Sequence, residues 1–211
     1  MDPIILIFQL AVLLMSVVIH EFAHGWMAYQ LGDSTAKYSG RLTLNPVRHL
    51  DFWGSFLVPL MIFIFSGGQA IFGWAKPVPF NPYNLRDQKY GVAKVAFAGP
   101  GINLLVALFF GLALRFMIPL GIPVLVDLVQ IFSLIVILNI LLAIFNLIPL
   151  PPLDGSKILF TFLPRSLDNV RVFLEQYGMF FLLFFIFFAF QFVFPLVFFI
   201  YRIIVGPSAI F

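Results

Sequence analysis

The sequence predicts an all-α polytopic membrane protein with four to six transmembrane or re-entrant segments. Of its 211 residues, 62% are hydrophobic and 10% are charged, and the mean hydropathy is +1.08. A soluble domain is about half apolar and about a quarter charged, so this chain has too little polar surface to dissolve in water. Its apolar residues also gather into runs of about 20 residues, the length of a membrane-spanning helix.

The first apolar run, Pro3–Leu31, is expected to be a retained membrane helix. A signal peptide is the alternative, but Asp2 stands where basic residues belong, the run is too long, and no small-residue cleavage site follows it. Phe52–Phe65 is shorter, so it either crosses the membrane or enters and returns. The remaining runs are Gly91–Leu120, Ile122–Ile148 and Met179–Val205, the last with Pro195 inside it.

Two stretches between these runs are too polar to be simple spans. The first, at 67–91, mixes Gly, Pro and Trp, and its "AIFGW" predicts a small β-like edge segment near residues 70–80. That edge could hold an extended peptide by main-chain hydrogen bonds, although an interfacial loop anchored by Trp74 is the alternative. The second, at 150–178, contains a short apolar piece and an amphipathic helix, which we expect near the interface.

The basic residues indicate the topology. Nine of the twelve Lys and Arg lie in the two large loop regions, a tenth, Lys94, lies near the start of the Gly91 segment, and the "LGIP" loop has none. Because basic loops stay on the cytoplasmic side, both large loops are expected there and the N-terminus outside, if Phe52–Phe65 makes no net crossing. A crossing by Phe52–Phe65 alone would put the two basic loops on opposite sides. We favour the first arrangement, which leaves Arg115 and Arg202 near the outer ends of their helices.

A cluster of metal-binding residue types lies near the end of the first predicted helix. His20 and His24 in "HEFAH" fit H-E-x-x-H, and a spacing of four puts both imidazoles on one helix face. Glu21 can then contact water at the metal without ligating the metal itself. Helix-end histidines bonded to headgroups are the alternative, but His24 is roughly 10 Å inside the helix end, where ionisable groups are costly. We therefore favour a zinc site.

A catalytic zinc ion needs a third protein ligand. The chain has no cysteine, so the third ligand must be His, Asp or Glu. Asp154 is the best placed, because it follows a membrane segment and a run of prolines that stops helix formation and aims it toward the bilayer interior. It could also cap a short helix starting near Gly155, with or without binding metal.

"HEFAH" followed by "NLIPLPPLDG" resembles the site-2 protease family of intramembrane zinc metalloproteases. The segments "GRLTLNPVRHLDFWGS", "GWAKPVPFNP" and "AGPGIN" are similar to its small prokaryotic branch, which carries no PDZ or nucleotide-sensing domain. The likeness runs over about residues 20–163. It implies one Zn²⁺ per chain and the following residue roles: His20, His24 and Asp154 as ligands, Glu21 as general acid and base, and Asn146 in holding the substrate or the oxyanion.

Other polar residues are weaker candidates. An amide in lipid is costly, so Asn146 should face protein or a water-filled cleft, and Asn139 on the same helix face is expected to bond another helix rather than act directly. Asn103 could support a metal ligand, but close helix packing is the default for "AGPGIN". His49, with Asp51, could orient a ligand or bind substrate, or be a solvated loop pair, and the sequence does not separate these.

The resulting expectation is a single membrane metalloprotease domain, 1–211, with a catalytic core at about 3–163 and interfacial and transmembrane helices at about 166–205. It would cleave membrane-spanning or membrane-associated proteins in a prokaryotic cell membrane, from a site open to the cytoplasm, and it would not bind nucleic acid. A prenyl-protein-processing peptidase would need a downstream glutamate ligand, and Glu175 is badly placed for it. An inactive scaffold of the same fold is the other alternative, and Glu21 argues against it.

Overall fold

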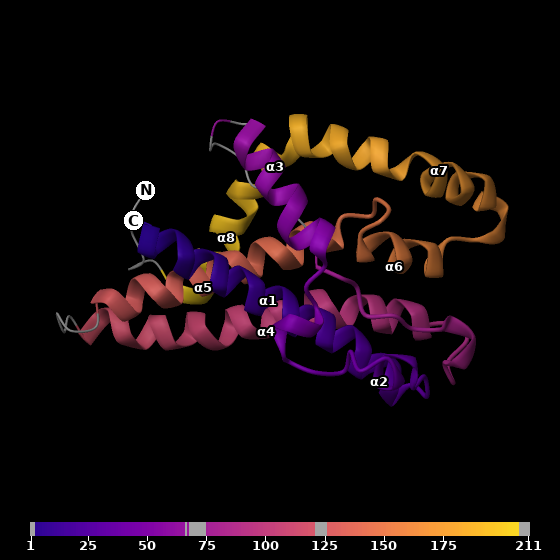
Figure 1. The fold of residues 1–211 in the computed structure, drawn as a ribbon, viewed down its shortest axis with the longest axis horizontal. Helices are drawn as coiled ribbons and strands as arrows, with labels where there is room; N and C mark the ends of the chain where they lie inside the picture. Colours follow the sequence, from indigo (N-terminus) through magenta and orange to yellow (C-terminus); the bar gives the residue numbers. More distant parts are fainter. Residues whose placement is uncertain (1–2, 66, 68–74, 121–125, 207–211) are drawn as a thin grey trace.

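A computed structural model describes residues 3–65, 67, 75–120 and 126–206 (Figure 1). In these ranges the chain forms helices and turns but no strand, which confirms the all-α class. The α-helices are α1 (Pro3–Gln30), α2 (Thr35–Tyr38), α3 (Val58–Phe65), α4 (Gly91–Met117), α5 (Val126–Leu147), α6 (Asp154–Phe162), α7 (Asp168–Phe184) and α8 (Val193–Val205). A π-helical turn, η2 (Phe52–Leu57), leads into α3.

Four of the described helical stretches are long and apolar enough to cross a membrane. Helix α1 has 28 residues and α4 has 27, so each is about 40 Å long and exceeds the hydrocarbon thickness of about 30 Å. The chain is a multi-pass membrane protein. The four stretches are Ile5–Gln30, Gly91–Met117, Leu128–Leu147 and Arg165–Val205.

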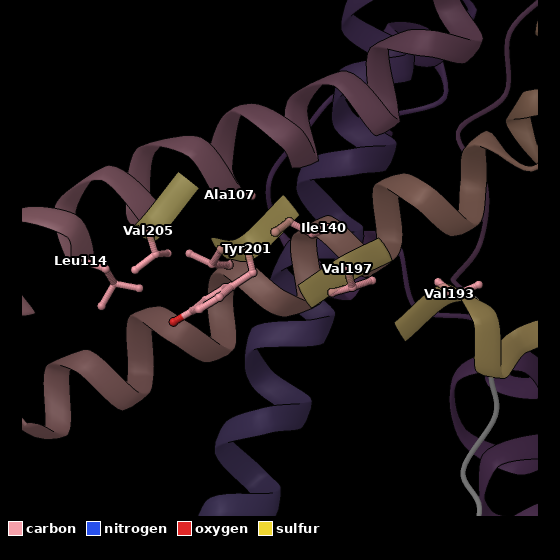
Figure 2. Packing of buried hydrophobic residues seen from close by; sticks show 8 residues of the cluster. Ala107, Leu114, Ile140, Val193, Val197, Tyr201 and Val205 are labelled. Atoms are coloured by element: carbon pink, nitrogen blue, oxygen red, sulfur yellow. The ribbon is translucent and has the colours of Figure 1, made fainter. Parts of the chain in front are cut away.

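Helix α4 packs against α1, α5, α6 and α8 and is their common partner. It runs beside α5 and crosses α1 (Figure 1). A buried apolar cluster joins α4, α5 and α8, with Leu114, Ile140 and Val197 among its members (Figure 2). Tyr201 is buried in this cluster, and its hydroxyl hydrogen-bonds the hydroxyl of Ser133 on α5 at 2.9 Å. This cluster holds α4, α5 and α8 together at a distance from the "HEFAH" motif of α1.

After the Phe52–Phe65 segment the chain returns to the place from which it left, which is the arrangement expected if the segment makes no net crossing. The backbone N–H of Lys76 donates to the carbonyl of His49 at 2.8 Å, so the chain leaves and returns at the same place. The β-like "AIFGW" at 70–74 lies outside the described residues. The part of the predicted edge at 75–80 is not a strand but an irregular segment that runs past α1.

The last apolar stretch differs from its predicted boundaries. We expected an interfacial helix to end before a membrane helix starting at Met179, but α7 continues to Phe184. The irregular turns fall at Phe185–Phe192 instead, and α8 then turns away from α7 to pack on α5 (Figure 1). Pro195 explains the position, because its ring lacks an N–H and crowds the carbonyl four residues earlier, at Gln191.

Asp33 holds the loops beyond α1 together and is fully buried. Its Oδ1 accepts from the backbone N–H and hydroxyl of Thr35 at 3.1 and 2.6 Å and from the side-chain amide of Asn84 at 2.9 Å. Its Oδ2 accepts from the backbone N–H of Asn81 at 2.7 Å. This carboxylate therefore fixes where the 75–80 segment ends.

The absence of net crossing by Phe52–Phe65 can be tested with single cysteines, since the chain has none of its own. We expect Val47→Cys and Tyr83→Cys, both at exposed positions, to react with a membrane-impermeant thiol reagent from the same side of the membrane. Arg115→Cys, at the other end of α4, should react only from the opposite side. Labelling of Val47→Cys and Tyr83→Cys from opposite sides would contradict the arrangement.

Asp33 should make stability depend on pH. Burial acts to raise the pKa of Asp33, but hydrogen bonds from Thr35, Asn84 and Asn81 outweigh it and hold the pKa below its ordinary value of 3.8. Its stabilising effect is then fully present above about pH 4 and is lost as the pH falls through the lowered pKa. Asp33→Asn, which presents an amide N–H₂ to these donors, should lower the free energy of unfolding by about 1–3 kcal/mol at pH 7.

Chemical unfolding in detergent micelles at pH 7 and at successively lower pH measures this difference, which should shrink as the pH falls. Asp87→Asn is the control. Hydrogen bonding by Lys94 and by the backbone of Tyr90 also lowers the pKa of Asp87, but Asp87 lies at the surface. An equal loss of stability in both variants would count against the role of the buried carboxylate.

Candidate metal centre

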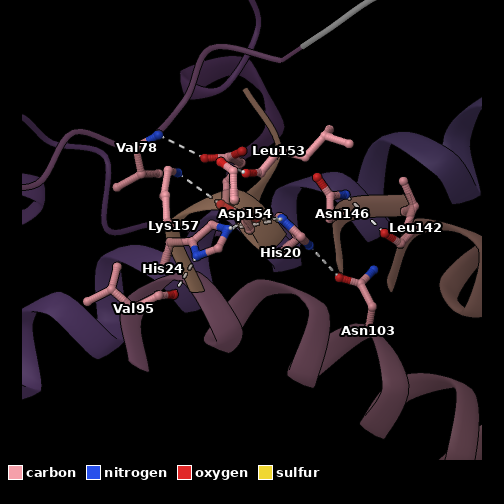
Figure 3. A network of polar contacts seen from close by, with 12 residues as sticks. His20, His24, Val78, Val95, Asn103, Leu142, Asn146, Leu153, Asp154 and Lys157 are labelled. Atoms are coloured by element: carbon pink, nitrogen blue, oxygen red, sulfur yellow. Dashed lines mark hydrogen bonds and ion pairs between the residues drawn. The ribbon is translucent and has the colours of Figure 1, made fainter. Parts of the chain in front are cut away.

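The two histidines of "HEFAH" and the aspartate of "LDG" converge on one point (Figure 3). Oδ2 of Asp154 lies 3.2 Å from Nε2 of His20 and 3.0 Å from Nε2 of His24. The two Nε2 atoms lie 3.0 Å apart. Ligand atoms around a tetrahedral zinc ion are about 3.3 Å apart, given bonds of about 2.0–2.1 Å, so the three atoms have the separation that a shared ion requires.

Helix α4 orients both histidine rings through hydrogen bonds to Nδ1, the ring nitrogen that faces away from the common point. Nδ1 of His24 donates to the backbone carbonyl of Val95 at 2.7 Å, and Nδ1 of His20 donates to Oδ1 of Asn103 at 2.7 Å. With Nδ1 used in this way, each ring presents the lone pair of Nε2 to the common point. Asn103 thus hydrogen-bonds one of the predicted metal ligands, a role for which the sequence made it only a weak candidate.

A chain of buried amides continues behind Asn103. Its Nδ2 donates to Oδ1 of Asn139 on α5 at 2.8 Å, and Nδ2 of Asn139 donates to the hydroxyl of Ser16 on α1 at 2.9 Å. The interhelical bond expected of Asn139 is therefore present. The chain ties α1, α4 and α5 together at the level of His20.

Two glycines create the space in which the ligands meet. A Cβ on Gly99 would lie 2.6 Å from Nε2 of His20 and closer still to Nε2 of His24, so the ligand atoms fit only because α4 has no side chain there. A Cβ on Gly155 would collide with the carbonyls of Leu147 and Ile148, so its absence lets α6 start against the end of α5. The "AGPGIN" motif predicted close helix packing around Gly99 but not the space for the ligand atoms, and no role was predicted for Gly155 in "LDGS".

Asp154 is the first residue of α6, and Leu153 takes the N-cap position without a side-chain bond. The carboxylate of Asp154 is thus directed to the histidines rather than to the helix N-terminus (Figure 3). Its other oxygen, Oδ1, accepts from Nζ of Lys157 at 2.9 Å.

A cavity of about 150 Å³ lies next to the three ligand atoms. Glu21 lines it and is half-buried, and its Oε2 accepts from the backbone N–H of Val78 at 2.8 Å. Asn146 also lines it, and the Nδ2 of Asn146 donates to the carbonyl of Leu142 on its own helix at 3.0 Å. The predicted general base and the predicted substrate-binding amide therefore share one cavity with the predicted ligands.

Known proteins resemble this chain over about four fifths of its length. The family model described as peptidase family M50 matches residues 118–189, a range that includes Asp154 and Asn146. A protein of Bacillus subtilis (strain 168) named "Putative zinc metalloprotease YwhC" is 39% identical over 170 residues, covering 79% of this chain and 74% of that protein. The chain belongs to peptidase family M50. The resemblance to site-2 proteases is thereby confirmed.

Relatives within family M50 also include longer proteins. "Putative zinc metalloprotease Rip2" of Mycobacterium tuberculosis (strain ATCC 25618 / H37Rv) is 29% identical over 170 residues, covering 81% of this chain. The aligned part is 62% of that protein's length, and it is 61% for the protein of the same name in Mycolicibacterium smegmatis, at 29% identity. No solved structure matches the chain.

His49 does not belong to the group of ligand atoms in this M50 chain. It is fully buried in the loop after α1, where Nε2 donates to the carbonyl of Thr43 at 2.8 Å. Asp51 caps the η2 turn by accepting from the backbone N–H of Gly54 at 2.8 Å. Each residue of this ambiguous pair is engaged by its own loop, so within the described residues the geometry favours a structural role.

The space at Gly99 can be tested with two neighbouring glycines. We expect Gly99→Ala to abolish or strongly weaken zinc binding, because its methyl group would occupy the point where the ligand atoms meet. Gly101→Ala is the matched control on the same helix, since the atom nearest to its methyl group would be in the ring of Phe97, at 3.3 Å. Zinc content of the purified proteins measures the effect, and equal zinc in both variants would contradict this assignment.

Proposed function

We propose that this chain is an intramembrane zinc endopeptidase that hydrolyses peptide bonds of membrane-spanning or membrane-associated proteins. The observation that carries the proposal is the convergence of His20, His24 and Asp154 beside Glu21 in one cavity. Two imidazole nitrogens and one carboxylate oxygen form a donor set that suits zinc, and we propose one ion per chain. Membership in family M50 and the names of the relatives support the same assignment.

The residues around the cavity supply the acid and base chemistry. Zinc, when bound, is a Lewis acid that polarises a carbonyl and lowers the pKa of water. Glu21 takes a proton from the attacking water and gives it to the leaving amine. The N–H of Val78 holds one oxygen of Glu21, so that the carboxylate is fixed toward the cavity. Asn146 is placed to hold the substrate carbonyl or the developing oxyanion.

The size of the cavity supports an extended substrate. An α-helix is about 10–12 Å wide, and a cavity of about 150 Å³ has no room for one, so a helical substrate must unwind before cleavage. The segment 75–80 offers few backbone donors to such a peptide. Lys76 and Val78 already donate within the protein, and Pro77 and Pro79 have no N–H. Residues 75–80 would therefore bind the substrate peptide mainly through their own backbone carbonyl oxygens, and not through the alternating N–H and carbonyl bonds of a β-strand pair.

We propose that substrate and water reach the site from the cytoplasmic side of a prokaryotic cell membrane. The loops that follow α1, those that precede α4 and the helix α6 meet at the "HEFAH" end of the bundle (Figure 1). Ten of the twelve basic residues lie between Lys37 and Lys94 or between Lys157 and Arg171, while Arg115 and Arg202 lie at the other end of α4 and in α8. Basic residues favour the cytoplasmic side.

Glu21→Gln should abolish cleavage while leaving zinc bound, with a loss of activity on the order of 10²–10⁴-fold, because the amide cannot accept the proton. The measurement is cleavage of a panel of single-span membrane fusion proteins, together with metal analysis. His20→Ala and Asp154→Ala should instead lose the metal. Glu175→Gln is the matched control, since Glu175 is the other glutamate of the chain and pairs with Arg171 at the surface.

Normal cleavage by Glu21→Gln would overturn the mechanism. If the wild-type protein binds zinc but cleaves no member of the panel, while Glu21→Gln behaves identically in every assay, the inactive scaffold of the same fold is the better description.

A further inference from the structure

Lys157 contacts the carboxylate of one of the three candidate metal ligands. Its Nζ donates to Oδ1 of Asp154 at 2.9 Å, while Oδ2 of the same carboxylate faces the two histidines. The carboxylate is 8% exposed, whereas the lysine side chain is 41% exposed and reaches in from the surface. The two oxygens of Asp154 therefore have different partners, one cationic and one facing the ligand point.

The geometry of α6 fixes this contact. Asp154 and Lys157 are three residues apart, so both side chains lie on one face of the helix. The first turn is held by the hydroxyl of Ser156, which donates to the carbonyl of Leu153 at 2.7 Å. In the next turn, the hydroxyl of Thr161 donates to the carbonyl of Lys157 at 2.8 Å. The ammonium group is thus presented to Oδ1 by an ordered helix.

A carboxylate can bind a metal ion through one oxygen or through both. A catalytic zinc ion keeps one of its four positions free of protein ligands, and a second oxygen from Asp154 would compete for that position. A group that hydrogen-bonds a ligand from outside fixes how that ligand is presented. An ammonium group on Oδ1 does this, because it occupies that oxygen and opposes the approach of a second cation to it.

We propose that Lys157 is a positioning residue that makes Asp154 a single-oxygen ligand. The inference rests on the proposed function, in which Asp154 binds the metal. This role distinguishes Lys157 from an ordinary ion pair such as Lys94 with Asp87, where the carboxylate is 26% exposed rather than 8% and the 2.6 Å contact involves none of the candidate metal ligands.

The test uses Co²⁺ in place of zinc, because its visible absorption weakens when a fourfold site gains a fifth ligand atom. Lys157→Met removes the ammonium group and retains a similar length. We expect it to bind Co²⁺ at least as tightly as the wild-type protein, since a positive charge near the ion is lost. We expect a weaker absorption and a fall in kcat of about 10–100-fold with little change in KM.

Two further variants complete the experiment. Lys157→Arg keeps a cationic donor and should restore the wild-type spectrum, and it also serves if Lys157→Met does not fold. Lys94→Met, which removes a lysine from an exposed pair, should leave spectrum, affinity and kcat unchanged. An unchanged spectrum in Lys157→Met, or weaker Co²⁺ binding, would overturn the proposal, since weaker binding means that Lys157 only supports the fold of α6. Altered KM with an unchanged spectrum would also overturn it, because Lys157 would then contact the substrate.

Failure of the proposed function has a different signature. A wild-type protein that binds no Co²⁺ would refute the metal centre itself. A wild-type protein that binds Co²⁺ with a fourfold spectrum keeps the metal centre, and the comparison with Lys157→Met then decides the role of Lys157 alone.

Discussion

Polar groups buried in a membrane protein must find their partners inside the protein, and in this chain that constraint falls on two imidazoles of α1. Water cannot satisfy their inner nitrogens, so α4 does so with the carbonyl of Val95 and the amide of Asn103. Asn103 must in turn be satisfied, and Asn139 on α5 provides the partner. The requirement to satisfy each group therefore links three helices at one level of the bundle.

This linkage also determines where the ligands can meet. Because α4 lies directly behind the histidines, any side chain at Gly99 would fill the space between the ligand atoms. Helix α6 starts in contact with the end of α5, because Gly155 has no side chain there. The carboxylate of Asp154 therefore lies next to the two histidines. The separation of the ligand atoms thus depends on two positions without a side chain, and a dense interior gives such contacts little freedom to relax.

The approach to the centre is built from irregular segments. The η2–α3 excursion leaves and returns beside His49, and the segment after it passes α1 and donates to Glu21 through Val78. Asp33 fixes the end of that segment from the loop beyond α1. Backbone without helical hydrogen bonds is tolerated at membrane depth only where it is buried in protein or lines a wet cavity, and the 75–80 segment meets that condition.

The sequence by itself determined the class of the molecule and predicted the histidine and carboxylate side chains that the structure brings together. Composition and run length are enough to predict a helical membrane protein, and a spacing of four places His20 and His24 on one helix face because that periodicity is local. Tertiary structure alone decided the remainder. Residues far apart in sequence meet where α4 contacts the histidines at Gly99, where Oδ2 of Asp154 meets the two histidines, and where the chain returns beside His49. The bend at Phe185–Phe192 depends on how α8 packs on α5. Hydropathy and motif spacing carry no information on such contacts, because they arise only when the helices pack.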